Sequence, residues 1–396
     1  MKRGIFVVTT DYKPSLGGVA EMTYQVALGF SRAGWRVVVL APEGDDNGFD
    51  AKQPFETVRV LPVEFGGPLR TLRWTMDLTR FRRRLKDIAN ERGIRYVLNM
   101  DSGGYESLSG YLRSRALDAL KLPQGIMFYG RDVVTFPTFP WHRRKLYRSI
   151  VARVHDVYCI SRFTGEQAVA SFGDGLEPII TGAGVRPELL PARVDRRAAR
   201  GRLEITARHV VLTVGRLVPR KGIDMVIRAM PRVLSEVDDV LYLVAGAGPD
   251  LERLRGLAEE VGCAADVRFD GRFEDELLAH YYGAADVFVM PARYVPGEDA
   301  EGFGIVYAEA GHYGLPVIGG RAGGALDAVI DGHTGLLVDP ENVEEIAAGL
   351  TTLLKDPPLR RQLGHAGRIH VRRRLTWDEV VKRFEEGVRS TLAGTG

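Results

Sequence analysis

The chain has 396 residues, a length that suits two domains of roughly 150–200 residues each better than one. Hydrophobic residues make up 45% of the sequence and charged residues 27%, which is typical of a globular protein and argues against intrinsic disorder. The net charge of +3 is too small to indicate nucleic-acid binding by bulk charge.

Short runs rich in Val and Ile alternate with longer amphipathic stretches in the first half, a pattern typical of βα units with a parallel sheet. A helix over residues 19–32 is predicted to end at Gly34. A second helix carries an apolar stripe on one face and basic residues, within 80–86, on the other. The predicted strands of this half are residues 5–9, 36–41, 58–62, 96–100, 125–129 and 157–161.

The alternation restarts near Val210, after a stretch (residues 184–208) that is rich in Arg, Pro and Ala and that we interpret as a linker. The tail, residues 375–392, predicts a helix. The predicted strands of the second half are residues 210–215, 241–245, 267–269, 287–290 and 316–318.

These elements predict an α/β protein of two Rossmann-like doubly wound domains that face each other across a cleft. The expected domains are residues 1–190 and 191–374, with a C-terminal helix at 375–396 that returns to the first domain.

The two cysteines, Cys159 and Cys263, fit no metal-ligand spacing and no disulfide framework, so we interpret them as reduced, buried thiols of a cytosolic protein. Only four strongly apolar residues follow the opening Met-Lys-Arg-Gly, too few for a signal peptide, and no apolar run reaches the length of a membrane span. We therefore expect a cytoplasmic protein.

The first charged site is the loop of residues 215–222, between a predicted strand and a predicted helix. Arg220 and Lys221 lie at the helix N-terminus, where the helix dipole disfavours cations, and Arg216 lies on the loop that leads to it. A bound diphosphate would resolve this conflict, since guanidinium and ammonium groups both bind phosphate oxygens and stabilise a departing diphosphate. A solvated basic turn explains the loop equally well when the loop is taken alone.

The second charged site is residues 301–309, where a helix is predicted to begin near Gly304. The glycines at 302 and 304 let a ligand approach the backbone, and the first N–H groups of the helix can bind oxygen anions. Glu301 and Glu309 lie eight helical steps apart, at most ~12 Å, about the reach from a hexose to a ribose across a diphosphate. Carboxylates suit sugar hydroxyls. An ordinary helix N-terminus explains Glu301 but not the two glycines.

Two glycine-rich turns carry less information. Gly17 and Gly18 follow a predicted strand and could approach phosphate or sugar, although an ordinary βα turn has the same pattern. The Gly246–Gly248 turn resembles a dinucleotide fingerprint, but Leu251 occupies the third glycine position, so we interpret it as a tight turn. The sequence has no signature of a catalytic triad, a Cys-His pair or a zinc site, and we predict no metal.

In this order and at this separation, the two charged sites resemble the paired signature of the retaining glycosyltransferases with two Rossmann domains, the GT-B architecture. Together with residues 289–293 and 316–324, they make the second half similar to bacterial mannosyltransferases that act on phosphatidylinositol mannosides. The resemblance is strong over residues 210–374. In the first half it rests on the Gly17-Gly18 turn and residues 160–164.

The resemblance implies an N-terminal acceptor-side domain and a C-terminal donor-binding domain. It also implies that the reaction retains the anomeric configuration without an established protein nucleophile, and that no cofactor or metal is tightly bound. As catalytic residues it implies Arg216 and Lys221 on the donor diphosphate and Glu301 on the hexose. As donor-binding residues it implies Gly17, Gly18, Phe273, the backbone N–H groups of Phe303, Gly304 and Ile305, and Glu309 on the ribose.

The chain departs from the family pattern at three places. Tyr129, three residues before Asp132, stands where many relatives have a His that touches the sugar. Tyr129 cannot be a cation near neutral pH, so the donor hexose stays open, and both residues are candidate sugar or acceptor contacts. Arg186 stands where an Asp is usual, and Asp327 where a Glu is usual; neither lies in the diphosphate site.

The acceptor side is defined by composition alone. Aromatic residues within 136–141, including Trp141, precede basic residues within 142–148, and such a segment could touch a lipid headgroup or an anionic acceptor. A packed loop with solvated helix faces explains the same residues.

We predict a nucleotide diphosphate sugar as co-substrate, GDP-mannose first and a UDP-sugar second. The acceptor is a glycan, glycolipid or small molecule, and peripheral contact at the inner face of the cell membrane stays open.

Two other classes of function are compatible with the sequence. Nucleotide-sugar epimerases share the two-domain layout, and a non-catalytic nucleotide-sugar binding subunit would need the same pocket. Glu301 and Glu309, together with Arg216 and Lys221, favour the transferase.

Overall fold

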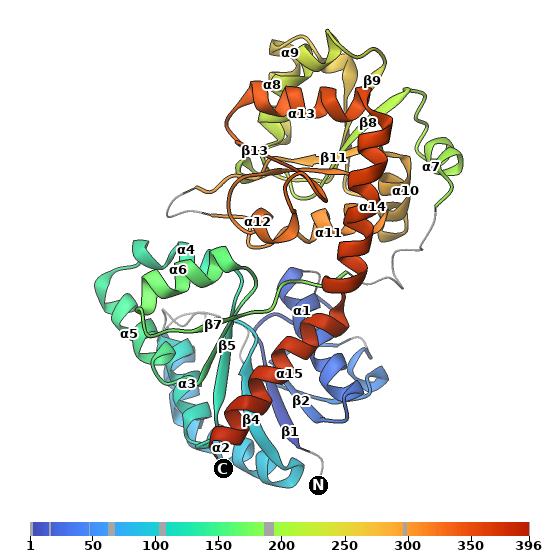
Figure 1. Cartoon of the computed structure of the whole chain (residues 1–396). Helices are drawn as coiled ribbons and strands as arrows, with labels where there is room; N and C mark the ends of the chain where they lie inside the picture. Colours follow the sequence, from blue (N-terminus) through green and yellow to red (C-terminus); the bar gives the residue numbers. More distant parts are fainter. Residues whose placement is uncertain are drawn as a thin grey trace. The chain divides into compact units, whose positions relative to one another are not determined.

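The computed structural model describes residues 3–15, 17–46, 48–61, 68–102, 108–185, 194–295 and 299–395, with the backbone alone at 68–77, 108 and 109. The chain divides into two compact units, each with its own parallel sheet (Figure 1). Unit 1 comprises Met1–Gly182 together with Trp377–Gly396, and unit 2 comprises Ala183–Thr376.

Unit 1 is built on seven parallel strands in the order β3-β2-β1-β4-β5-β6-β7. The strands are β1 (Gly4–Val8), β2 (Arg36–Pro42), β3 (Glu56–Leu61), β4 (Ile94–Asn99), β5 (Gln124–Phe128), β6 (Asp156–Cys159) and β7 (Pro178–Ile180). The helices are α1 (Gly18–Arg32), α2 (Pro68–Arg92), α3 (Leu108–Asp118), α4 (Arg131–Val134), α5 (Trp141–Val151), α6 (Arg162–Phe172) and α15 (Trp377–Gly394).

Different helices cover the two faces of this sheet. Phe6 and Val8 of β1 pack with Leu85 of α2 on one face, because alternate residues of a strand point to the same side. On the other face Tyr158 of β6 contacts Phe384 of α15, with ring centroids 4.7 Å apart. The last helix also packs along α1 and so completes the core of unit 1 (Figure 1).

Unit 2 is built on six parallel strands in the order β10-β9-β8-β11-β12-β13. The strands are β8 (His209–Val214), β9 (Val240–Ala245), β10 (Val267–Gly271), β11 (Val287–Met290), β12 (Val317–Gly320) and β13 (Gly335–Val338). The helices are α7 (Arg196–Arg202), α8 (Ile223–Leu234), α9 (Leu251–Glu260), α10 (Asp275–Ala284), α11 (Ile305–His312), α12 (Ala325–Ala328), α13 (Val343–Lys355) and α14 (Pro357–Arg374). The core joins α8, α9 and α13 to the sheet, and α8 buries Val226, Ile227 and Met230 at helical spacing.

The predicted architecture of two Rossmann-like doubly wound domains is confirmed, and each predicted strand overlaps an observed one. Two strands were not predicted, β7 and β13. Both are short edge strands, and they begin with Pro and Gly, which strand patterns disfavour. Cys159 and Cys263 are buried and unpaired, as expected.

The division of the chain differs from the expected boundary at residue 190 and from the expected linker at 184–208. Unit 2 begins at Ala183, and helix α7, inside that linker, packs against α10. Asp195 caps α7 by accepting a hydrogen bond from the backbone N–H of Ala198. No helix within the described ranges has both the length and the apolar character that a membrane crossing requires.

Candidate active site

In each unit the strand order reverses at one point, between β1 and β4 in unit 1 and between β8 and β11 in unit 2. Ligands of open α/β sheets bind at the carboxyl ends of the strands at such a point, because the adjacent loops diverge there. The loop after β8 carries Arg216, Arg220 and Lys221, and the loop after β11 carries Glu301. The cationic loop and the first acidic residue identified in the sequence therefore lie together at the switch point of unit 2.

Glu301 is the centre of this cluster. Its Oε2 accepts hydrogen bonds from Nζ of Lys221 and from Nη1 of Arg220, each at 2.6 Å. Nε of Arg220 also lies 2.7 Å from Oδ2 of Asp299. Burial alone would raise the pKa of Glu301, but the charges of Lys221 and Arg220 outweigh it and lower the pKa. Glu301 is therefore a firmly ionised carboxylate.

The cationic loop is held in place by the backbone around it. Gly222 caps α8 with φ 71°, and a Cβ there would lie 2.2 Å from the carbonyl oxygen of Pro291. Arg293 binds both carboxylate oxygens of Asp224, at 2.6 and 2.8 Å, and donates to the carbonyl of Pro219 at 2.9 Å. This clamp joins the loop after β11 to the start of α8 and fixes Lys221 opposite Glu301.

The loop that carries Glu301 also depends on glycine. A Cβ on Gly324 would lie 2.0 Å from the carbonyl oxygen of Gly302, and the N–H of Gly324 donates to the carbonyl of Glu301 at 2.8 Å. Gly304 caps α11 in the left-handed region with φ 80°. Helix α11 starts directly after it, and the N–H of Tyr307 donates to the carbonyl of Gly304 at 2.9 Å. The N–H groups that precede Tyr307 at the helix start have no intrahelical acceptor.

The other predicted donor residues of unit 2 lie on different loops and helices. Arg216 is exposed on the loop after β8. Glu309 lies on α11, where its Oε2 accepts a hydrogen bond from the hydroxyl of Tyr282 at 2.7 Å. Phe273 follows β10 and packs against Tyr281, with ring centroids 4.8 Å apart. Phe303 is buried, and Ile305 opens α11.

The Gly246–Gly248 turn supports the cationic loop. A Cβ on Gly246 would lie 1.9 Å from the carbonyl oxygen of Gly215, and one on Gly248 would lie 2.1 Å from that of Leu217. The N–H of Leu217 donates to the carbonyl of Ala247 at 3.1 Å. These glycines therefore let two loop backbones approach each other.

The switch point of unit 1 carries mainly acidic side chains, with Nη2 of Arg113 3.9 Å from Oδ1 of Asp101. Asp101, after β4, accepts hydrogen bonds from the hydroxyl of Thr9 at 2.8 Å and from the backbone N–H and hydroxyl of Thr10 at 2.5 and 3.1 Å. Burial, and then the charge of Asp101, raises the pKa of Asp11. Gly17 caps α1 in an extended conformation, and its Cβ position lies 3.2 Å from Oδ2 of Asp11. The Cβ position of Gly18 faces open space.

Tyr129 and Asp132 lie at the carboxyl end of β5. The carboxylate of Asp132 accepts hydrogen bonds from the N–H of Tyr129, at 3.1 Å to each oxygen, and from the N–H of Gly130 at 2.9 Å. Burial raises the pKa of Asp132 to about 6 against the effect of these N–H groups. Burial, and then the charges of Asp101 and Asp132, raises the pKa of Tyr129. Asp132, on α4, thus holds the turn that joins β5 to this helix.

Sequence reasoning missed several residues of the site. Asp299, Asp224 and Arg293 gain their roles through contacts between the loops after β8 and β11, and no local pattern marks them. Asp101 follows a predicted strand directly, and that position was a usable signal. Arg186 lies outside the described residues. The described residues contain no group of three or more His, Cys, Asp or Glu side chains that could hold a metal ion.

The aromatic residues within 136–141, which lead into the start of α5, differ in burial. Phe136 is buried in the core of unit 1, whereas Trp141 is 70% exposed. Arg143, Lys145 and Arg148 are also exposed on α5. The packed-loop interpretation therefore holds for Phe136 and not for Trp141.

Two family models match the chain. Residues 17–179, within unit 1, match the glycosyl transferase 4-like domain, and residues 195–370, within unit 2, match the glycosyl transferases group 1.

Curated relatives carry mannosyltransferase names. A GDP-mannose-dependent alpha-(1-6)-phosphatidylinositol monomannoside mannosyltransferase from Mycolicibacterium smegmatis is 38% identical over 58% of this chain and 61% of its own length. A GDP-mannose-dependent monoacylated alpha-(1-6)-phosphatidylinositol monomannoside mannosyltransferase from Corynebacterium glutamicum is 36% identical over 65% of this chain and 68% of its own length. The match thus spans less than two thirds of the length of the first of these relatives and slightly more than two thirds of the second.

Solved structures share the fold over the whole chain. Sucrose-phosphate synthase from Thermosynechococcus elongatus has a TM-score of 0.76 at 23% identity, with both chains covered completely. The Anabaena protein HepE in complex with UDP has a TM-score of 0.77 at 18% identity, covering 98% of this chain and all of HepE.

Proposed function

The chain belongs to the glycosyltransferases of GT-B architecture, and we propose that it is a retaining hexosyltransferase that uses a nucleotide diphosphate sugar. The observation that carries this proposal is the cluster at the switch point of unit 2, where Arg220 and Lys221 converge on Glu301. We assign the donor to unit 2 and the acceptor to unit 1.

In this proposal Lys221 and Arg216 bind the donor diphosphate. Lys221 already holds an anion, the carboxylate of Glu301, so its ammonium group is oriented for a negative partner. Arg216 is exposed on the same loop and offers a planar fork for phosphate oxygens. When the bond between the anomeric carbon and the phosphate oxygen breaks, these cations stabilise the charge of the departing diphosphate.

The two glutamates bind the hydroxyl groups of the two sugars of the donor, which lie on either side of its diphosphate. Glu301 accepts hydrogen bonds from the hexose, aided by the backbone N–H groups of Phe303, Gly304 and Ile305 at the start of α11. Glu309 accepts from the ribose, with its carboxylate already oriented by Tyr282. The backbone around Phe273 meets the base, and Gly17 and Gly18 approach the donor phosphate.

Retention of the anomeric configuration fits the electrostatics of Glu301. A carboxylate with a lowered pKa, paired with two cations, is a weak base and a weak nucleophile. We therefore assign deprotonation of the acceptor hydroxyl to an oxygen of the departing diphosphate, on the same face of the sugar. The acceptor oxygen then bonds to the anomeric carbon as the phosphate leaves.

The names of the relatives support mannose from GDP-mannose as the first choice of donor, and the fold shared with UDP-bound HepE keeps a UDP-sugar as the second. Neither requires a tightly bound cofactor in this proposal. The acidic switch point of unit 1, with Asp11 and Asp101, suits an acceptor rich in hydroxyl groups, such as a glycan, a glycolipid or a small polyol.

Peripheral membrane contact is part of the proposal because a glycolipid acceptor lies in the bilayer. Trp141 is 70% exposed beside Arg143 and Lys145, and an exposed aromatic ring with neighbouring cations suits the surface of an anionic leaflet. We place the protein in the cytoplasm, at the inner face of the membrane.

Trp141→Ala should reduce sedimentation with anionic vesicles and leave transfer to a water-soluble acceptor unchanged. Equal sedimentation of both proteins would remove this contact from the proposal.

A thermal-shift panel of GDP-, UDP-, ADP- and dTDP-sugars tests the donor. Selective stabilisation by one nucleotide identifies the base through linkage, and no stabilisation by any of them contradicts the proposal. With that donor, NMR of the product reports the anomeric configuration, and inversion would overturn the mechanism. Epimerised sugar formed from UDP-GlcNAc alone would indicate an epimerase. Binding without acceptor-dependent nucleotide release would indicate a binding subunit.

A further inference from the structure

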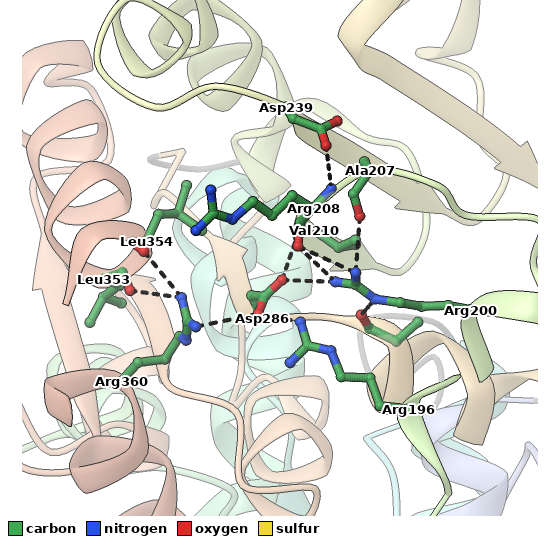
Figure 2. Close-up of polar contacts among 11 residues, drawn as sticks. Arg196, Arg200, Ala207, Arg208, Val210, Asp239, Asp286, Leu353, Leu354 and Arg360 are labelled. Atoms are coloured by element: carbon green, nitrogen blue, oxygen red, sulfur yellow. Dashed lines mark hydrogen bonds and ion pairs between the residues drawn. The ribbon is translucent and has the colours of Figure 1, made fainter. Parts of the chain in front are cut away.

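The amino edge of the unit 2 sheet, opposite the candidate active site, contains a second cluster of charge. Asp286 directly precedes β11, and its side chain is 1% exposed. Figure 2 shows Arg196, Arg200 and Arg360 converging on this carboxylate. Arg200 lies 3.0 Å and Arg360 3.6 Å from it, Arg196 also binds it, and the N–H of Val210 donates to it at 2.9 Å.

One carboxylate does not balance this cluster. Three guanidinium groups share Asp286, so positive charge remains in excess around it. Burial, and then the charge of Arg196, lowers the pKa of Arg200, as expected where cations crowd one another.

A pocket of about 250 Å³ opens beside this cluster, where α7, α10 and α14 meet. Its charged lining consists of Asp286 with Arg196, Arg360, Arg361 and Arg368, four positive groups and one negative. Arg360 also donates to the carbonyls of Leu353 and Leu354, at 3.2 and 3.3 Å, and so is fixed at the end of α13 (Figure 2). The side chains that line the pocket therefore carry a formal excess of three positive charges.

The remaining wall includes two tyrosines. Tyr282 and Tyr313 stack with ring centroids 5.5 Å apart at an angle of 14°. The hydroxyl of Tyr282 donates to Glu309. The hydroxyl of Tyr313 is buried and has no hydrogen-bond partner among the described residues. A buried hydroxyl without a partner is costly, and an acceptor oxygen of a ligand would satisfy it.

We propose that this pocket is a second anion site that binds a small phosphorylated molecule. It is centred on Asp286 at the amino edge of the sheet, and the hydrogen bond of Tyr282 with Glu309 joins its wall to a residue assigned to the donor. Guanidinium groups from α7 and α14 offer several planar forks, which match phosphate oxygens, and Tyr313 adds a hydroxyl donor. The volume lies below the range of about 300–1,000 Å³ that is usual for drug-sized ligands, so a nucleotide sugar is too large and a diphosphate group fits.

Titration calorimetry with inorganic diphosphate tests the site. Because diphosphate would also bind the donor site, the titration uses Lys221→Ala, which weakens the donor site alone. We expect Lys221→Ala to bind diphosphate. Adding Arg361→Glu, an exposed residue outside the Asp286 network, should weaken that binding at least tenfold. Adding Arg228→Glu, an exposed arginine on α8 outside the pocket, should leave it unchanged.

Absence of diphosphate binding in Lys221→Ala would overturn the inference, as would equal losses in the two charge-reversed variants. The donor panel keeps this result separate from the proposed function. Arg361→Glu with wild-type Lys221 should show the same stabilisation by the nucleotide sugar as the wild type. Loss of that stabilisation would mean that Arg361 belongs to the donor site and would also overturn the inference.

Discussion

The two sheets have the same strand order around their switch points, but different charged side chains lie at their carboxyl ends. In unit 2 Arg220 and Lys221 bind Glu301 there, and Arg216 is exposed on the same loop. In unit 1 the corresponding edge carries Asp11, Asp101 and Asp132. Topology thus decides where a ligand can bind, and side-chain charge decides which ligand it is. A diphosphate suits the first edge, and hydroxyl groups suit the second.

The largest expected effect comes from removing the central cation of unit 2. Lys221→Ala deletes a charge-assisted contact of about 1.5–3 kcal/mol, so affinity for the nucleotide sugar should fall by roughly 10–150-fold. Calorimetry measures the loss. Lys86→Ala, on an exposed position of α2 in unit 1, is the matched control and should bind as the wild type does. A Lys221→Ala variant with wild-type affinity would remove the contrast between the two edges.

The next effect concerns Gly324, which packs against the backbone of the Glu301 loop. In Gly324→Ala the new Cβ would lie 2.0 Å from the carbonyl oxygen of Gly302, which is backbone and cannot rotate away. Such overpacking costs typically about 1–3 kcal/mol, and here it also displaces Glu301. Urea denaturation should show lower stability, and donor affinity should fall with it. Unchanged stability would mean that the loop carrying Glu301 can shift away from residue 324 without cost. The contact with Gly324 would then not hold Glu301 in place.

A smaller effect, dependent on pH, belongs to unit 1. The pKa of Asp132 is raised to about 6 in the fold, from an ordinary value of 3.8. The stabilisation from its protonated form is therefore complete below about pH 4 and lost as the pH rises through 6. Because the side chain is partly exposed, the change is on the order of 1 kcal/mol. Urea denaturation of the wild type and Asp132→Asn should diverge between about pH 4 and 6 and run parallel above. A constant difference from pH 4 to 8 would contradict the raised pKa.

The smallest expected change in stability belongs to the glycine pair of unit 1. The Cβ of Gly18→Ala would meet no atom within 4 Å, so stability should stay within about 0.5 kcal/mol of the wild type. If Gly18 approaches a donor phosphate, the donor KM should still rise by a few-fold. Unchanged stability with an unchanged KM would count against a ligand at this turn.

The sequence predicted the fold well because its signals are local. Runs of Val and Ile mark buried parallel strands. Among the observed strands, only β7 and β13, two short edge strands, were not predicted. The cationic loop was recognisable because Arg220 and Lys221 stand where a helix dipole disfavours them. The second site was recognisable because the glycines at 302 and 304 let a ligand approach the backbone.

Contacts between distant segments were decided by the tertiary structure alone. Lys221 and Glu301 are 80 residues apart and meet because β8 and β11 are neighbours at the switch point. The clamp of Arg293 on Asp224, the Asp286 network and the place of α15 in unit 1 have the same origin. Local composition determines which segments become strands and helices, because each residue's backbone and burial preferences act within a few positions. Which segments then lie side by side depends on strand order and long-range packing, and no short stretch of sequence encodes either.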